Sequence, residues 1–226
     1  MEDRARLCRR LGYTFHDPDM LELALSHRSV SRRSNNERLE FLGDAQLSQI
    51  ISTELFHRFP EAAEGQLTRM RASLVRGQTL AEVARELGVG AYLILGGGEL
   101  KSGGNRRDSI LADALEALIG AMVIDGGEEA CRRVVLGWFA ERLEAISPQS
   151  ARKDAKTRLQ EWLQARKHEL PLYEVLAVTG QAPKQTFEVK CALPELQREF
   201  VAGGPSRRRA EQQAAEQALS WLEQNL

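Results

Sequence analysis

The most informative stretch of the chain reads Asn36-Glu-Arg-Leu-Glu-Phe-Leu-Gly-Asp-Ala45. Glu37, Glu40 and Asp44 stand at positions i, i+3 and i+7, which places three carboxylates on one face of an α-helix within two turns. Two turns further on, the same stripe becomes apolar, so the carboxylates stand where the helix enters the core. Partly buried like charges repel one another, and they need a compensating group.

A second carboxylate pair, Asp113 and Glu116, stands at i and i+3 of a helix expected over 108–125. Small residues around the pair would let another helix approach closely. Two helices that each present carboxylates from an inward face form divalent-metal sites in helical proteins, and oxygen ligands favour Mg²⁺ or Mn²⁺ over zinc. The alternative is that these are ordinary helix carboxylates paired with arginines, of which Arg38, Arg69 and Arg71 are available.

The segment 37–45 resembles the signature of the bacterial ribonuclease III family, and the resemblance extends over almost the whole chain. The other segments that carry it are Leu25-Ser-His-Arg-Ser29, Glu64-Gly-Gln-Leu-Thr-Arg-Met-Arg-Ala-Ser-Leu-Val75, Gly98-Glu-Leu-Lys-Ser-Gly-Gly104 and Ile110-Leu-Ala-Asp-Ala-Leu-Glu-Ala-Leu-Ile-Gly120. The acidic positions of the nine-residue signature are all present.

The resemblance implies that Glu40, Asp113 and Glu116 are ligands of Mg²⁺, for which Mn²⁺ can substitute. It also implies that Asp44 and Glu116 are essential to catalysis. Such a site suits phosphodiester hydrolysis, because carboxylate-held metal ions acidify water and neutralise charge in the transition state. The cuts made by this family leave a 5′-phosphate and a 3′-hydroxyl.

Three further residues take roles only through the resemblance. Glu37 and Glu64 match acidic positions that are auxiliary at the cleavage site. Phe41 matches a residue that inserts into the partner subunit of a homodimer. From the residues alone, a phenylalanine next to Glu40 on this helix is better interpreted as part of the core.

The periodicity divides the chain into an all-α part and a mixed part. The first part is expected to hold helices over 4–11, 18–25, 37–59, 65–75, 79–87, 108–125 and 128–146, broken at Gly and Pro positions. The polar segment 147–154 is typical of a linker. The second part is expected to hold a helix over 157–166, strands over 172–179, 186–193 and 200–202, and a helix over 206–224. In the first strand, Tyr173, Val175 and Ala177 should share one face.

The second part carries a basic cluster. Arg207, Arg208 and Arg209 stand in the first turn of the last helix, where cations oppose the helix dipole but can receive phosphates together with the backbone amides. The alternative is an ordinary solvated charge run. Gln160 and Gln164, at i and i+4, could reach 2′-hydroxyls in the shallow minor groove of A-form RNA.

The α-β-β-β-α order and the segment Gly203-Gly-Pro-Ser-Arg-Arg-Arg-Ala210 resemble a double-stranded-RNA-binding domain. One departure is the loop Gly180-Gln-Ala-Pro-Lys-Gln185, which lacks the histidine that members of this family often carry. Lys184 can replace that histidine electrostatically in contacting RNA.

Composition excludes several other classes. The 226 residues carry a net charge of −1, and three separated cysteines argue against a disulfide framework or a zinc knuckle. The N-terminus has no signal-peptide pattern, and no apolar run is long enough to span a membrane. The stretch Gly96–Ser102 mimics a phosphate-binding loop, but Leu100 stands where a glycine is required, so no nucleotide cofactor is expected.

We therefore expect an all-α endonuclease domain over 1–146, a linker over 147–154 and a small α+β double-stranded-RNA-binding domain over 155–226. The expected activity is Mg²⁺-dependent cleavage of double-stranded RNA by a cytoplasmic homodimer. The resemblance implies processing of rRNA precursors, tRNA precursors and mRNA. Two rivals stay open: a non-cleaving RNA-binding protein whose helical part only dimerises, and a metal-dependent phosphohydrolase of small molecules, which would not need the second domain.

Overall fold

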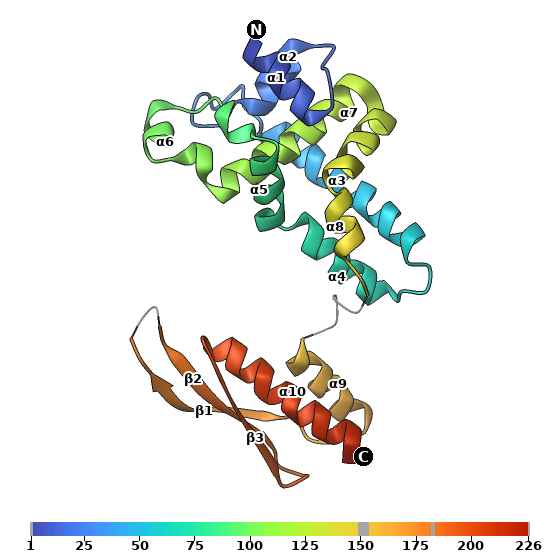
Figure 1. Cartoon of the computed structure of the whole chain (residues 1–226), viewed down its shortest axis with the longest axis vertical. Helices are drawn as coiled ribbons and strands as arrows, with labels where there is room; N and C mark the ends of the chain where they lie inside the picture. The colour runs from blue at the N-terminus through green and yellow to red at the C-terminus, as the bar shows by residue number, and fades with distance from the viewer. Residues whose placement is uncertain (1, 149–153, 182–183, 226) are drawn as a thin grey trace. The chain divides into compact units, whose positions relative to one another are not determined.

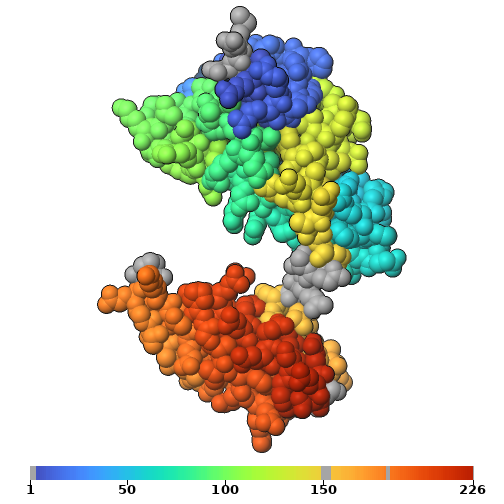
Figure 2. All heavy atoms as spheres, in the orientation of Figure 1, coloured from blue at the N-terminus to red at the C-terminus, as the bar shows by residue number. Residues whose placement is uncertain are grey.

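The computed structural model describes residues 2–148, 154–181 and 184–225. The chain divides into two compact units, Met1–Arg152 and Lys153–Leu226. In Figures 1 and 2 the first unit is the blue to yellow part of the chain, and the second is the gold to red part. The expected domain limits at 146 and 155 stay predictions. Residues 149–153 of the expected linker lie outside the described residues, whereas Asp154 caps the helix that follows.

The first unit is helical throughout its regular elements (Figure 1). These elements are α1 (Glu2–Leu11), α2 (Pro18–Leu25), α3 (Glu37–Arg58), α4 (Glu64–Val75), α5 (Gly77–Glu86), the short 3₁₀ turn η1 (Val89–Ala91), α6 (Gly97–Lys101), η2 (Gly104–Arg106), α7 (Asp108–Trp138) and α8 (Ala140–Ala145). The segment that mimics a phosphate-binding loop thus forms the short helix α6. None of the described helices is both long and apolar enough to cross a lipid bilayer.

Helices α3 and α7 form the centre of this unit, and two glycines let them cross at close range. A Cβ atom added at Gly43 of α3 would lie 1.7 Å from the backbone oxygen of Glu116. A Cβ added at Gly120 of α7 would lie 2.1 Å from the backbone oxygen of Leu39. At each crossing point any side chain would collide with backbone, so glycine is required there. The crossing brings the carboxylate-bearing turns of the two helices together.

The core surrounds this crossing. From Ile110 to Met122, helix α7 is buried on almost every side, as expected of a helix that is apolar all round. The apolar stripe of α3 continues from the carboxylates into Leu47 and Ile51, both fully buried. The only side chains of α7 between residues 110 and 122 that keep substantial exposure are polar, which leaves the carboxylates at the rim of the core.

One glycine and one aromatic residue shape the last helices of the first unit. Gly127 has φ 81° and interrupts the helical backbone of α7, which confirms the predicted break at this point. The single helix expected over 128–146 is wrong in one respect, because it ends at Trp138 and resumes as α8. Phe139 occupies the break with its side chain fully buried, so core packing decides where the chain turns.

The second unit packs two helices on an antiparallel sheet in the order β1-β2-β3 (Figure 1). Its elements are α9 (Ala155–Ala165), β1 (Leu172–Thr179), β2 (Thr186–Leu193), β3 (Arg198–Gly204) and α10 (Arg207–Asn225). Helix α10 packs on α9, β2 and β3, and its alanine face is buried with Leu159 and Leu163 of α9. The predicted α-β-β-β-α order is confirmed.

The face assignment in β1 needs one correction. A bulge lies between Val175 and Ala177, so that Val175 pairs with Val189 but Ala177 pairs with Glu188. Because of this extra residue, Val178 pairs with Phe187, whereas uninterrupted alternation would have placed Ala177 there. Ala177 therefore does not share a face with Tyr173 and Val175, as the sequence pattern had predicted.

Candidate metal centre and nucleic-acid interface

The α3–α7 crossing gathers three carboxylates. Glu40 comes from the first turns of α3, and Asp113 and Glu116 come from consecutive turns of α7. One carboxylate oxygen of each lies within 4.8 Å of those of the other two, and all three side chains are half-buried. Spacing along each helix put these residues on inward faces, and the glycine contacts bring the two faces close enough for one ion to reach all three.

This closeness is electrostatically costly without a cation. Burial, followed by repulsion from Asp44, Glu40 and Asp113, raises the pKa of Glu116 from 4.5 to about 8. Burial and the neighbouring carboxylates also raise the pKa of Glu40, and burial raises that of Asp113. Each shift means that the folded protein disfavours the negative charge on its own. Three carboxylates with oxygen atoms at this spacing and an uncompensated charge fit a hard divalent cation such as Mg²⁺.

The arginine whose charge acts on the cluster is not among those suggested by the sequence. Arg71 donates instead to the hydroxyl of Ser52 at 3.2 Å. Against the effect of burial, Arg28 lowers the pKa of Glu40, and His27 followed by Arg28 lowers that of Asp113. Arg28 belongs to a segment that the sequence analysis quoted without giving it a role.

Asp44 and Glu37, in the first two turns of α3, lie at the edge of the cluster. Asp44 is exposed one turn beyond Glu40, and its charge contributes to the raised pKa values of Glu40 and Glu116. Glu37 is exposed as well. Its carboxylate accepts a hydrogen bond from the side-chain amide of Asn35 at 3.1 Å and a longer one from Arg28 at 3.4 Å.

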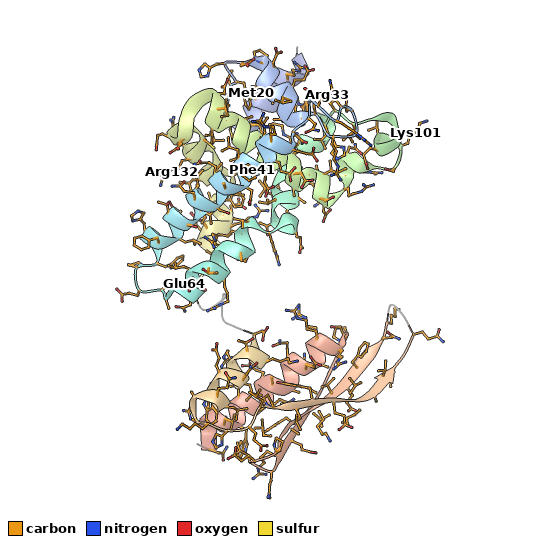
Figure 3. The ribbon with its side chains drawn as sticks, turned by 180° about the vertical axis from the view of Figure 1, so that it is seen from behind. Met20, Arg33, Phe41, Glu64, Lys101 and Arg132 are labelled. Atoms are coloured by element: carbon orange, nitrogen blue, oxygen red, sulfur yellow. The ribbon has the colours of Figure 1, made fainter. Side chains whose placement is uncertain are left out.

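Glu64 lies elsewhere in the same unit. It is the first residue of α4, and its carboxylate accepts a hydrogen bond from the hydroxyl of Thr68 at 2.8 Å. Figure 3 shows it near the end of the unit away from Met20. Glu64 lines a cavity of about 520 Å³ together with Phe56 and Leu67. Within one copy of the chain, the structure does not bring Glu64 to the Glu40 cluster.

Phe41 follows Glu40 on α3 and points away from the core (Figure 3). Its side chain is 80% exposed, the largest exposure among the large hydrophobic residues that the structure describes. Packing in the core, which the residues alone favoured, is therefore wrong. A solvent-exposed phenylalanine beside the carboxylate cluster is a candidate contact for another molecule.

The second unit brings part of the predicted nucleic-acid surface together. Gln160 and Gln164 are exposed on α9, as their spacing predicted. Gln160 and Arg208 line one cavity of about 610 Å³, although they lie almost 50 residues apart in the sequence. Arg209 is exposed in the same first turns of α10, and its backbone N–H donates to Ser206 Oγ at 3.3 Å. Lys184 is exposed in the loop between β1 and β2.

Arg207 differs from its two neighbours. Its Nε donates to Glu211 at 2.9 Å, and Glu211 also accepts from Lys156 of α9 at 2.6 Å. Glu211 is only 8% exposed, so this acidic residue ties the start of α10 to the start of α9. Lys156 was missed by the sequence analysis, because nothing local to residue 156 indicates a partner 55 residues away.

Comparisons with known proteins agree with both units. Residues 17–143 match the family described as ribonuclease-III-like, and residues 155–222 match the double-stranded RNA binding motif. The chain is 75% identical to ribonuclease 3 of Alcanivorax borkumensis, over 98% of this chain and 97% of that protein. Two solved structures of the nuclease domain of ribonuclease III from Campylobacter jejuni are also similar. One is 39% identical, covers 65% of this chain and 100% of that one, and superposes with a TM-score of 0.62. The other, described as showing structural flexibility in a region involved in dimer formation, is 40% identical, with coverages of 60% and 95% and a TM-score of 0.59.

A helical nuclease unit with a carboxylate cluster, joined to a unit that binds double-stranded RNA, defines a class of endoribonucleases. The chain belongs to the ribonuclease III family of bacteria, and it is an endoribonuclease.

Proposed function

We propose that this protein hydrolyses phosphodiesters in double-stranded RNA with Mg²⁺, leaving 5′-phosphate and 3′-hydroxyl ends. The observation that carries the proposal is the Glu40–Asp113–Glu116 cluster, whose oxygens lie within 4.8 Å of one another on a nuclease fold. Its raised pKa values support a cation there, because a divalent ion would stabilise charges that the protein alone disfavours. Mn²⁺ prefers similar oxygen ligands and is expected to substitute.

The residues of the cluster then take distinct roles. Glu40, Asp113 and Glu116 hold the cation at the rim of the core. When bound, Mg²⁺ supplies positive charge beside the scissile phosphate and makes a water molecule more acidic. Asp44 stays exposed beside the cluster, where its carboxylate can accept a hydrogen bond from the attacking water. Removing either Asp44 or Glu116 should therefore abolish cleavage without unfolding the protein.

The second unit supplies recognition of the duplex. We assign contacts with 2′-hydroxyls and bases of the minor groove to Gln160 and Gln164, and contacts with phosphates to Arg208 and Arg209. Lys184 contributes a positive charge from the β1–β2 loop. Arg207 contributes less to phosphate binding than its neighbours, because its Nε is held by Glu211.

The working unit is proposed to be a homodimer. Phe41 carries this part of the proposal, since its side chain is 80% exposed and a second copy of the chain would cover it. Glu64 lies away from the cluster of its own copy, and an auxiliary role at the cleavage site would require RNA or the partner to bring the two regions together. We further propose a cytoplasmic enzyme that processes precursors of rRNA and tRNA and structured mRNA.

The test is incubation of a long RNA duplex with the protein, with and without Mg²⁺, followed by mapping of the product ends. Glu116→Gln keeps the shape of the side chain and removes its charge. Glu144→Gln is the matched control, because Glu144 is an exposed glutamate of α8 outside the cluster. We expect the Glu144 variant to cut and the Glu116 variant to bind the duplex without cutting it. Binding without cleavage by the wild-type protein would support the rival, a non-cleaving RNA-binding protein.

A further inference from the structure

A polar cavity of about 750 Å³ lies beside the carboxylate cluster, and the proposed chemistry does not use it. One wall is the segment His27–Arg32, and the other is the start of α7 with Ser109 and Asp113. Asp113 therefore belongs to both the cluster and the cavity. A substrate bound at the cluster would extend directly into this space.

Backbone hydrogen bonds hold His27 and the residues that flank the His27–Arg32 wall. The backbone N–H of His27 donates to Ile94 at 3.0 Å, and the backbone N–H of Asn36 donates to Ser26 at 2.9 Å. Asn36 itself is 3% exposed, so this support is buried. The cavity is thus bounded by a supported segment that can hold a side chain in one place.

A second set of bonds fixes the side chains at the start of this wall. The backbone N–H of Gly96 donates to Ser29 Oγ at 2.9 Å, and Ser29 Oγ lies 2.8 Å from Nδ1 of His27. The backbone N–H of Ser29 also lies 3.2 Å from Nδ1. Because an N–H can only donate, Nδ1 of His27 is the acceptor of this bond. The His27 ring and the Ser29 hydroxyl are therefore locked together.

Arg28 stands between these two anchored residues and is itself held only weakly. Its side chain is 69% exposed, and its described hydrogen bond is the contact of 3.4 Å with Glu37. A guanidinium has five N–H donors, so most of its donors remain for another acceptor. Arg28 also lies close enough to Glu40 and Asp113 to lower the pKa of both. Two other arginines line the cavity: Arg107 is already paired with Glu99 at 2.8 Å, and Arg32 is exposed at the other end of the His27–Arg32 segment.

We propose that this cavity is a phosphate subsite, in which Arg28 binds the phosphodiester next to the scissile one on the same RNA strand. The inference rests on the proposed function, which places the scissile phosphate at the carboxylates. A strand laid across the cluster brings a neighbouring phosphate close to several negative charges. Arg28 offers that phosphate a fork of donors at the one place where the wall is anchored on both sides.

Glu37 completes the arrangement. In the free protein its carboxylate accepts the long hydrogen bond from Arg28 and keeps the guanidinium over the cavity. A phosphate is a stronger acceptor for arginine than an exposed carboxylate at 3.4 Å, so binding of the strand would exchange one partner for the other. Arg28 is thus a positioning residue for the strand, and it acts on cleavage rather than on the affinity supplied by the second unit.

The experiment follows the logic of a double-mutant cycle. It combines Arg28→Gln in the protein with an uncharged linkage in place of one phosphodiester of the substrate. In a short duplex, single methylphosphonate linkages replace each of the three phosphates on either side of the cut, with 2′-O-methyl on the preceding sugar to keep the linkage stable. Duplexes with the 2′-O-methyl group alone are the substrate controls. Arg133→Gln is the protein control, because Arg133 is exposed on α7 and lines a different cavity with Tyr13 and Trp138.

We expect Arg28→Gln to cut the unmodified duplex about 10- to 100-fold more slowly in single turnover, the usual effect of losing a hydrogen bond to a charged group. Its affinity for the duplex should change less than about twofold, measured with the Glu116→Gln substitution in both backgrounds to prevent cutting. Arg28→Lys should recover part of the rate, and Arg133→Gln should match wild type. At one flanking position, the neutral linkage should slow wild type but not Arg28→Gln any further.

Equal slowing of wild type and Arg28→Gln by every neutral linkage would overturn the subsite, as would an unchanged rate for Arg28→Gln on the unmodified duplex. Cleavage of the unmodified duplex by wild type reports the proposed function separately. Preserved wild-type cleavage with no coupling at any position therefore removes the subsite alone.

Discussion

Gly43→Ala is the sharpest test of how the α3–α7 crossing builds the active site. The added Cβ would lie 1.7 Å from the backbone oxygen of Glu116 and 3.0 Å from the backbone N of Gly120. Both neighbours are main-chain atoms inside a buried helix, so they cannot move aside as a flexible side chain could. The two helices would have to separate by roughly 1.5 Å before the first contact became ordinary.

A matched substitution isolates the cost of that contact. Gly137→Ala also adds a methyl group within helix α7, but it would meet no atom within 4 Å. Both substitutions gain the helix propensity of alanine, which is worth up to about 1 kcal/mol. Overpacking of a rigid site costs about 1–3 kcal/mol, so the free energies of unfolding of the two variants should differ by about that amount.

The separation should also damage catalysis in the protein that remains folded. Glu40 is carried by α3, whereas Asp113 and Glu116 are carried by α7, so moving the helices apart opens the cluster directly. A displacement of about 1 Å commonly reduces catalytic rates by about 100-fold. Urea unfolding and single-turnover cleavage of an RNA duplex measure the two effects. Equal stability and equal rates for the Gly43 and Gly137 variants would show that the close crossing does not control the site.

Three other predictions address charge and association. In EDTA, the free energy of unfolding should fall as the pH rises from about 4.5 towards 8, because the folded state raises the pKa of Glu116 to about 8 and so favours the protonated carboxyl. Glu116→Gln should flatten that fall, which urea titrations at several pH values will measure; an unaltered slope would contradict the raised pKa. Arg208→Ala should lower the slope of log affinity against log salt by about 0.9 if the trend for B-DNA holds for duplex RNA, whereas Lys190→Gln, on the outer face of the sheet, should leave it unchanged. Equal slopes in gel-shift titrations would argue against the phosphate contact. Phe41→Ser should shift the protein towards monomer in analytical ultracentrifugation, since an exposed phenylalanine gains most from being covered by a second copy; an unchanged mass would exclude Phe41 from the interface.

Local spacing was enough to predict most helices of the first unit and the faces of the carboxylates, although not the break at Phe139. Glu40, Asp113 and Glu116 stand at helical spacings from other acidic residues, and the apolar stripe through Leu47 and Ile51 fixes which face of α3 turns to the core. The order of elements in the second unit was predictable for the same reason. Alternation and turn residues act over a few positions, and the fold did not overrule them except at the β1 bulge.

The tertiary structure decided everything that depends on distance between segments. Whether Glu40 comes within 4.8 Å of Asp113 depends on Gly43 and Gly120, whose partners lie on the opposite helix. The raised pKa of Glu116 follows from that closeness, since burial and repulsion act only after the helices have packed.

The same reason explains the positions that the sequence misjudged or left without a role. Phe41 is apolar, as core residues are, but among the residues that the structure describes no element of the first unit covers its side chain. In the sequence, Arg28 looks like any other surface cation. Only the folded structure shows that residues 94–96 and Asn36 hold its neighbours beside the cluster. Periodicity determines which side of an element a residue occupies, whereas long-range packing determines what that side meets.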